Sequence, residues 1–167
     1  MTEDVQDNIT IRAASVVDAP RVCRLIEPFV ARKQLLHRST EEISRLIKNG
    51  FVAEMSGEVV GFSAIDIYSR KMAELVCLAV AESCQGKGVG RLLVESCIQR
   101  AREHKVHELM AISAAEDFMK SCGFDFTLPE QKKAFFIHPG ESSTLMRTKA
   151  SSCDHCKVGE ESQSKQT

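Results

Sequence analysis

The sequence predicts one α/β domain built on a mixed β-sheet. Apolar segments of strand length alternate along the chain with segments whose apolar residues recur at helical spacing. Two early strands are separated only by Ser56-Gly57, a turn that makes them antiparallel neighbours. The later strands are joined through helices, as parallel strands usually are. With 167 residues, the chain has the length of a single domain.

The first half of the chain is expected to contain a strand, two helices and a hairpin. Asp18 and Pro20 are typical of a helix start, whereas Pro28 is expected to end or kink the same helix. Ser39 and Glu42 have the spacing of a capping box, which indicates the start of a second helix. The expected elements are strands at 9–12, 51–55 and 58–68, and helices from about 18 to 30 and from 39 to 49.

The second half centres on Gln85-Gly86-Lys87-Gly88-Val89-Gly90, a glycine-rich segment between a strand at 74–80 and a helix at 91–105. Its three glycines let the backbone expose successive N–H groups, and the helix adds its unpaired N-terminal donors and positive dipole end. The segment therefore predicts a phosphate or pyrophosphate site. Further on, strands are expected at 107–113, from 124 onward and at 144–147, with a short helix at 114–121.

The spacing of the glycines distinguishes several kinds of phosphate site. A nucleotide P-loop needs Ser or Thr directly after its Lys, but Gly88 follows Lys87 here. A dinucleotide fingerprint needs G-x-G-x-x-G in the first strand-helix-strand unit, whereas this segment has G-x-G-x-G in the middle of the chain. A connector without a ligand is a further alternative, although three glycines beside Gln85 and Lys87 are more than a turn needs.

Composition limits the remaining classes of function. The apolar content of 43% is enough for a sizeable core, and a net charge of −1 with dispersed Lys and Arg does not indicate a nucleic-acid-binding surface. The sequence shows no signal-peptide pattern and no apolar run of membrane-spanning length. Several of the seven cysteines fall on apolar faces, so we expect reduced thiols in a cytoplasmic protein. Residues 1–8 and 149–167 are expected to be disordered, which leaves a domain at 9–148.

The polar tail contains Cys153-Asp154-His155-Cys156, a C-x-x-C pattern with an inserted histidine. A zinc site needs about four ligands, and His138 is the only nearby addition to this pair. We therefore expect no metal and interpret these thiols as incidental.

The glycine-rich segment carries a family resemblance. Gln85-x-x-Gly88-x-Gly90 resembles the Q/R-x-x-G-x-G/A loop of the GCN5-related N-acetyltransferases (GNAT), and residues 118–124, F-M-K-S-C-G-F, are similar to that family's F-Y-E-K-x-G-F element. The resemblance covers residues 9–148. It implies the GNAT fold, a mixed and mostly antiparallel sheet of about six to seven strands flanked by about four helices. It also implies acetyl-CoA as the co-substrate.

Three segments resemble the acetyltransferase domain of the N-acetylglutamate synthases: residues 35–39, 73–80 and 128–133. This closer resemblance implies transfer of acetyl to the α-amino group of an amino acid, with glutamate as the leading acceptor, and a place in arginine biosynthesis. Many synthases also carry an amino-acid-kinase domain, so this chain is expected to be a stand-alone short form.

The resemblance assigns the donor site to one strand end and the loop that follows. In the family, the strand's backbone pairs with the pantetheine arm of coenzyme A, and the loop's N–H groups hold the pyrophosphate. The residues so assigned are Leu78, Ala79, Val80, Gln85, Gly86, Lys87, Gly88, Val89, Gly90 and Arg91.

The resemblance also assigns the catalytic groups. Glu74 is expected to be the general base, directly or through a water. Many family members protonate the departing thiolate with a tyrosine, but that position is Met119 here, and Ser113 is the substitute candidate. Cys77 matches a cysteine of the synthases and is a candidate substrate-binding residue, although a thiol in an apolar strand is more often part of the core.

The acceptor site is the least settled part of the prediction. Arg38, Lys132 and Ser143 are the candidates for binding a glutamate acceptor, the two cations pairing with its carboxylates. Glu141 stands where the synthases are expected to carry an arginine, and a carboxylate there would repel an acidic substrate. Another small amine, a protein amine or a non-catalytic coenzyme A-binding module therefore stay open as alternatives. Dimers are common among acetyltransferases of this size, so a homodimer is also open.

Overall fold

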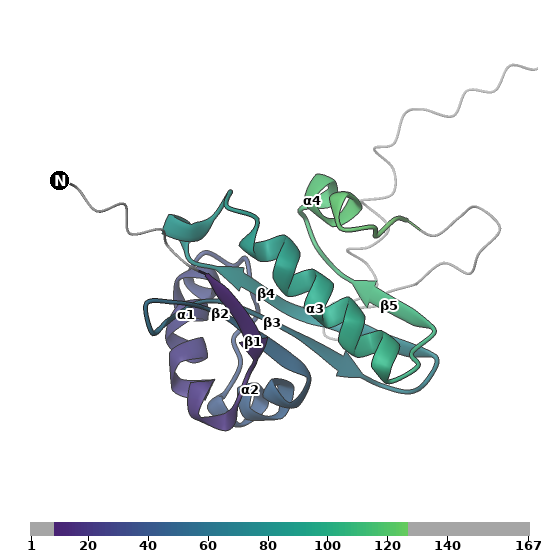
Figure 1. Ribbon diagram of the computed structural model, residues 1–167, viewed down its shortest axis with the longest axis horizontal. Coiled ribbons are helices and arrows are strands. Elements are labelled where there is room, and N and C mark those ends of the chain that lie inside the picture. The colour runs from purple at the N-terminus through teal and green to yellow at the C-terminus, as the bar shows by residue number, and fades with distance from the viewer. Residues whose placement is uncertain (1–8, 127–167) are drawn as a thin grey trace, which may run out of the picture. The chain divides into compact units, whose positions relative to one another are not determined.

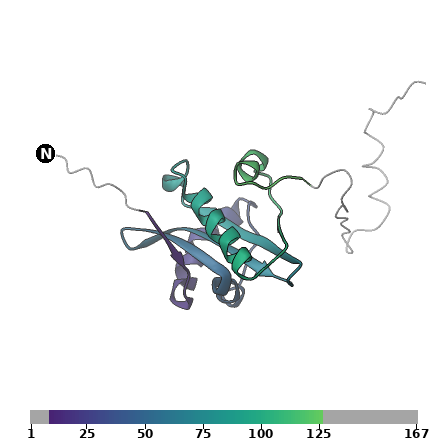
Figure 2. The same cartoon turned by 45° about the vertical axis from the view of Figure 1, so that its right-hand side comes forward.

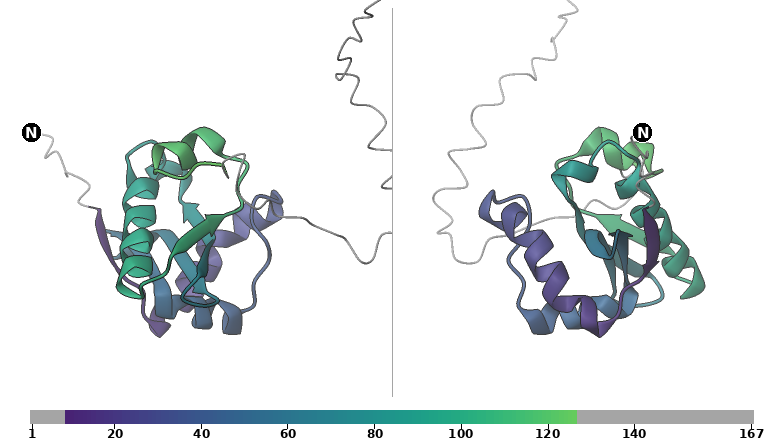
Figure 3. Two further views of the ribbon diagram at one scale, coloured as in Figure 1. Left: turned by 90° about the vertical axis from the view of Figure 1, so that its right-hand side faces the viewer. Right: turned by 60° about the vertical axis from the view of Figure 1, so that its left-hand side comes forward.

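A computed structural model describes residues 9–126 as one sheet with helices on both faces (Figure 1). The sheet has five strands in the order β1-β2-β3-β4-β5. Helices α1 and α2 cover one face and α3 covers the other, as the turned views show (Figures 2 and 3). The elements are β1 (Thr10–Ala13), η1 (Val16–Asp18), α1 (Ala19–Ala31), α2 (Thr40–Leu46), η2 (Ile47–Asn49), β2 (Gly50–Met55), β3 (Glu58–Ile67), β4 (Met72–Val80), η3 (Glu82–Cys84), α3 (Val89–Glu103), β5 (Glu108–Ala111) and α4 (Glu116–Ser121).

The predicted fold class is confirmed. The pairs β1–β2, β2–β3 and β3–β4 are antiparallel, and β4–β5 is parallel, so the sheet is mixed and mostly antiparallel. A strand is expected from residue 124 onward, but residues 124–126 have no strand structure, and the positions after them lie outside the described residues. The strand expected at 144–147 lies outside the described residues. Five of the six to seven expected strands are therefore seen between residues 9 and 126.

The predicted turn at Ser56-Gly57 joins β2 to β3. Met55 pairs with Glu58, so Ser56 and Gly57 alone form the loop. Both have positive φ angles, 51° at Ser56 and 82° at Gly57, as the turns that match strand twist require. The hairpin prediction is confirmed.

Two helix starts differ in how their first turns are capped. At α2 the expected capping box is present, because Ser39 Oγ accepts from the Glu42 N–H at 3.2 Å and Glu42 Oε2 accepts from the Ser39 N–H at 2.7 Å. At α1 the predicted start after Asp18 is confirmed, but its carboxylate does not cap that helix. Asp18 Oδ2 accepts from the N–H of Ser15 at 2.8 Å and binds Arg12. Pro28 is tolerated inside α1, which continues to Ala31.

Strand β4 is irregular in two ways that shape the site. Its pairing with β5 ends at Leu75–Ala111, although β4 itself continues to Val80. After Ala111 the chain leaves the sheet and turns toward α4 (Figure 1). Its register with β3 also shifts, so that Val76 is an extra residue between Leu75 and Cys77. Because of this bulge, Val76 and Cys77 both pack toward α1 and α2.

Candidate active site

The splay between β4 and β5 leaves backbone groups of β4 without a described partner strand. The Ala81 N–H donates to the Val60 carbonyl of β3 at 2.8 Å. Since backbone groups alternate in direction along an antiparallel strand, Leu78 and Val80 direct theirs to the other side, where β5 has ended. The Val80 carbonyl accepts the side chain of Gln85 at 2.9 Å. The N–H groups of Leu78 and Val80 are therefore oriented as the predicted pantetheine contact needs.

The glycine-rich segment forms the turn into α3. Gly86 and Gly88 have φ angles of 74° and 82°, in the left-handed region that favours glycine, and Gly88 is the N-cap of α3. The first helical bond joins the Leu92 N–H to the Gly88 carbonyl at 3.2 Å, so the N–H groups of Val89 to Arg91 lie in the unpaired first turn. The helix begins two residues earlier than predicted because Gly88 ends the turn. These donors and the dipole end suit a pyrophosphate.

Two residues of the predicted loop serve the protein's own structure. The Gln85 N–H donates to the Glu82 carbonyl at 3.2 Å, and its side chain binds Val80, so Gln85 braces the loop. Arg91 Nη1 donates to the Ser121 carbonyl at 2.7 Å and thereby ties α3 to the end of α4. Lys87 is exposed on the turn. Roles of these side chains toward coenzyme A stay predictions.

The predicted base Glu74 lies on the sheet face covered by α1 and α2. It is the third residue of β4, and its carboxylate Oε2 accepts a hydrogen bond from the Tyr68 hydroxyl. Asp66 of β3 is its direct cross-strand neighbour. The hydrogen bond to Glu74, followed by desolvation, raises the pKa of Tyr68 to about 12, so the phenol stays protonated.

Arg38 reaches the same part of the sheet from the segment before α2. Its Nη2 donates to the Val76 carbonyl, the residue inserted by the bulge, at 3.2 Å. Arg38 also interacts electrostatically with Tyr68 and with Cys77, lowering the pKa of each against larger opposing effects. The structure therefore brings the predicted carboxylate-binding cation and the predicted base together around one stretch of β4.

Cys77 is a core residue. The residue is only 4% exposed, and burial raises the pKa of its thiol to about 12. A neutral buried thiol is a poor nucleophile, so the geometry favours direct transfer over an acetyl-cysteine intermediate. The same burial leaves little surface for the predicted contact with substrate.

The candidates for the general acid are arranged differently from the family pattern. Met119 of α4 is buried in the same core cluster as Leu75 and Cys97. Ser113 lies two residues beyond β5, on the far side of the splay from β4, and its Oγ accepts the Ala115 N–H at 3.1 Å. Its catalytic role stays a prediction.

Tyr68 is the site residue that sequence reasoning missed. In the sequence it is the chain's single tyrosine, at the end of the strand expected at 58–68, and no motif includes it. Its position follows from the hairpin register: Asp66 pairs with Glu74, and Tyr68 is two residues beyond Asp66 on the same face. Tyr68 and Glu74 are thus diagonal neighbours, within reach of a long side chain.

Several predicted residues lie outside the described part of the chain. These are Lys132, Ser143, Glu141 and the Cys153–Cys156 segment. Within residues 9–126, no cluster of three or more His, Cys, Asp and Glu side chains is arranged to hold a metal ion. Within the same range, no helix has the length and apolar character needed to cross a bilayer.

Comparison with known proteins establishes the family. Residues 19–124 match the model of the acetyltransferase (GNAT) family, and the chain belongs to that family. It is therefore an acyltransferase by class. The resemblance that rested on the glycine loop and the 118–124 element is confirmed.

Relatives narrow the class further. An uncharacterized N-acetyltransferase of Chlorobaculum tepidum is 37% identical over 114 residues, which are 68% of this chain and 74% of that protein. The amino-acid acetyltransferase of Pasteurella multocida is 26% identical over 144 residues, 83% of this chain but only 33% of the relative. The N-acetylglutamate synthase of Neisseria gonorrhoeae, solved with coenzyme A and N-acetylglutamate, superposes with a TM-score of 0.62 at 30% identity. That match covers 68% of this chain and 27% of the synthase, so the chain spans about a third or less of these two amino-acid-specific relatives.

Proposed function

We propose that this chain transfers the acetyl group of acetyl-CoA to the α-amino group of an amino acid, with glutamate as the first candidate acceptor. The observation that carries the proposal is the end of β4–β5 pairing at Leu75–Ala111, followed on β4 by the glycine turn into α3. This arrangement offers strand N–H groups and a helix N-terminus in succession along one path. Coenzyme A carries the matching groups in the same order: the amides of its pantetheine arm suit the strand backbone, and its pyrophosphate suits the helix N-terminus.

Binding of the donor uses the backbone more than side chains. The amide groups of the pantetheine arm would pair with the N–H and carbonyl of Leu78 and the N–H of Val80. The pyrophosphate would accept from N–H groups of the glycine turn and the first turn of α3, where the helix dipole favours negative charge. In this orientation the thioester lies nearer the Leu75–Ala111 end of the splay, toward Glu74.

The chemical step needs no covalent enzyme intermediate. The acceptor's amine nitrogen attacks the thioester carbonyl carbon, a C–N bond forms and the C–S bond breaks. Glu74 takes the proton that the acceptor's ammonium group must lose before its nitrogen can attack. The second proton that the nitrogen loses as the amide forms goes to solvent, and the coenzyme A thiolate is protonated from solvent or through Ser113. A buried Cys77 with a raised pKa has no place in this sequence of events.

Acceptor recognition follows from the charges around β4. Arg38 offers guanidinium donors to a carboxylate, while Glu74 and Asp66 favour an ammonium group nearby. A zwitterionic α-amino acid carries both groups on adjacent atoms. The likeness to the N-acetylglutamate synthase of Neisseria gonorrhoeae supports glutamate as the acceptor. A role in arginine biosynthesis and a cytoplasmic location are part of the same proposal.

An acceptor panel tests the proposal. The protein is incubated with acetyl-CoA and single amino acids, polyamines, aminoglycosides or peptides, and free thiol release is followed. Release with glutamate above all other acceptors is the expected result. Preference for another amine would replace the acceptor, and coenzyme A binding without release from any acceptor would indicate a binding module instead.

A further inference from the structure

We propose that Tyr68 is a positioning residue for the acetyl transfer: its hydroxyl holds the Glu74 carboxylate in the orientation that accepts the amine proton. The inference rests on the proposed function, because it assigns Tyr68 a role through the predicted base. Its geometric basis is the hydrogen bond from the Tyr68 hydroxyl to Glu74 Oε2. With Oε2 engaged, Oε1 is the oxygen assigned to the acceptor's amine.

The backbone of Tyr68 is fixed independently of its side chain. The N–H groups of Tyr68 and Ser69 both donate to the Met72 carbonyl at 3.1 Å, which closes the β3–β4 turn. The residue just before β5 binds the same turn, since the His107 N–H donates to the Arg70 carbonyl at 2.9 Å. The phenol therefore projects from a rigid turn rather than a mobile loop.

Charge explains why Glu74 needs such a partner. Asp66 lies directly opposite Glu74 on the neighbouring strand, and like charges in this relation repel. Without a donor, the Glu74 side chain would rotate away from Asp66 and leave the reacting position. The Tyr68 hydroxyl opposes that motion.

Tyr68 donates this hydrogen bond without giving up its proton. Its pKa, raised to about 12 chiefly by the bond to Glu74, keeps the phenol neutral at physiological pH. A phenol held this way is a weak acid toward a departing thiolate. Tyr68 therefore differs in role and in position from the tyrosine that protonates the thiolate elsewhere in the family, whose place is taken by Met119 here.

Tyr68 is 56% exposed as a residue, so it is not an anchor of the core. Removing its hydroxyl as Tyr68→Phe should leave folding intact. A loss of activity in that variant then reports on the site.

The first test needs no turnover. The chain has one tyrosine and no tryptophan, so near-ultraviolet absorbance of tyrosinate reports Tyr68 alone. The midpoint should lie near 12 in the native protein and fall toward 10.0, the ordinary value, in Glu74→Gln. Asp66→Asn is the matched control, expected to lower the midpoint less, and Arg38→Gln should not lower it. An ordinary midpoint in the folded native protein overturns the proposal.

The second test uses the acceptor that supports turnover. Tyr68→Phe should lower kcat about 10-fold with an unchanged KM for acetyl-CoA, and should cause little further loss in a Glu74→Gln background. An equal fold-loss in both backgrounds, or an unchanged kcat, overturns the positioning role. Absence of turnover with every acceptor would instead defeat the proposed function, and with it this role, while the titration would still report the hydrogen bond.

Discussion

Glu74 is the residue on which the proposed chemistry depends most. Replacing it as Glu74→Gln keeps the side chain's size and removes its ability to take the amine proton. We expect turnover to fall by about 100-fold or more with little change in affinity for coenzyme A. Steady-state kinetics and coenzyme A binding by calorimetry measure the two effects separately. The matched control is Asp66→Asn, which removes one carboxylate from the same face; an equal loss in both variants would retire Glu74 as the base.

Cys77 lies three residues after Glu74 on the same strand, but its replacement is expected to leave activity nearly unchanged. Its thiol is buried, and its pKa is raised to about 12, so almost none is thiolate at neutral pH. Cys77→Ala should therefore retain activity within about threefold while losing roughly 1 kcal/mol of stability through the small cavity. Rates and urea unfolding of the same preparation check this. A loss of activity of 100-fold in a stably folded variant would restore a covalent or substrate-contact role.

Individual site residues were predictable only where a motif or a family resemblance named them. Glu74 and Arg38 were named this way, and the structure places both beside the same stretch of β4. Tyr68 belongs to no motif, and its relation to Glu74 depends on the hairpin register and a side-chain rotamer. The burial of Cys77 depends on the bulge at Val76, which turns two consecutive side chains to one face. No periodicity in the apolar β4 sequence encodes that shift.

At the scale of elements, the turn into α3 decides whether the helix presents its N-terminus to a ligand. Gly88 has a φ of 82°, and a Cβ there would meet no atom within 4 Å, so its substitution is costly for backbone conformation alone. At Gly90 a Cβ would lie 3.4 Å from Phe118, an ordinary contact. We expect Gly88→Ala to strain the turn by about 1 kcal/mol and weaken coenzyme A binding about 5-fold or more.

Gly90→Ala is the matched control for that change. It adds the same methyl group two residues later, in the first turn of α3, without a left-handed backbone, and its affinity for coenzyme A should stay within about twofold of the original. Calorimetric titration of coenzyme A into both variants provides the comparison. Equal affinities would show that the left-handed turn does not govern donor binding.

Element types were largely predictable, and their ends were not. The hairpin turn and the Ser39 capping box are local, so their sequence signals sufficed. The end of β5 at Ala111 and the absence of strand structure at 124–126 are set by how the chain leaves the sheet, which local patterns do not record. The family resemblance implied only that the backbone of β4 pairs with the pantetheine arm. The separation of β4 from β5 has no local signal, because a continuous apolar strand looks the same whether it is paired on one edge or two.

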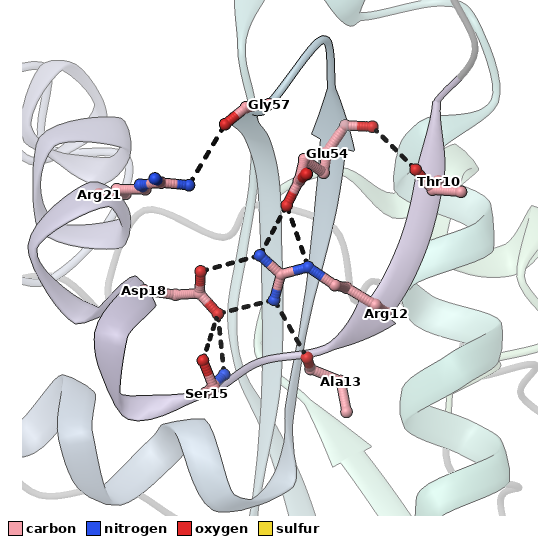
Figure 4. A network of polar contacts seen from close by, with 8 residues as sticks. All are labelled: Thr10, Arg12, Ala13, Ser15, Asp18, Arg21, Glu54 and Gly57. Atoms are coloured by element: carbon pink, nitrogen blue, oxygen red, sulfur yellow. Dashed lines mark hydrogen bonds and ion pairs between the residues drawn. The ribbon is translucent and has the colours of Figure 1, made fainter.

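At the scale of the whole molecule, one polar cluster joins the first strand, the second strand and the first helix (Figure 4). Arg12 donates to both carboxylate oxygens of Asp18, at 2.8 and 2.9 Å, and to Glu54 Oε2 at 2.6 Å. Asp18 is 1% exposed, so it depends on these partners and on Ser15 for its hydrogen bonds. Arg21 adds a separate bond from α1 to the Gly57 carbonyl at 3.2 Å.

This cluster should make stability depend on pH in the acid range. The hydrogen bonds from Arg12, with Ser15 adding to them, hold the pKa of Asp18 well below its usual range. A carboxyl group whose pKa is depressed by folding contributes its stability above the unfolded value of about 3.9, and loses it as pH falls toward the folded value. Asp18→Asn should therefore cost about 2 kcal/mol at pH 7 and progressively less between about pH 5 and pH 2. Urea unfolding of both proteins across that range measures the difference.

Glu54→Gln, which removes the more exposed partner of Arg12, should cost less than half as much at pH 7. A cost of Asp18→Asn that stays constant down to pH 2 would mean that shape, rather than charge, makes Asp18 necessary where β1, β2 and α1 meet.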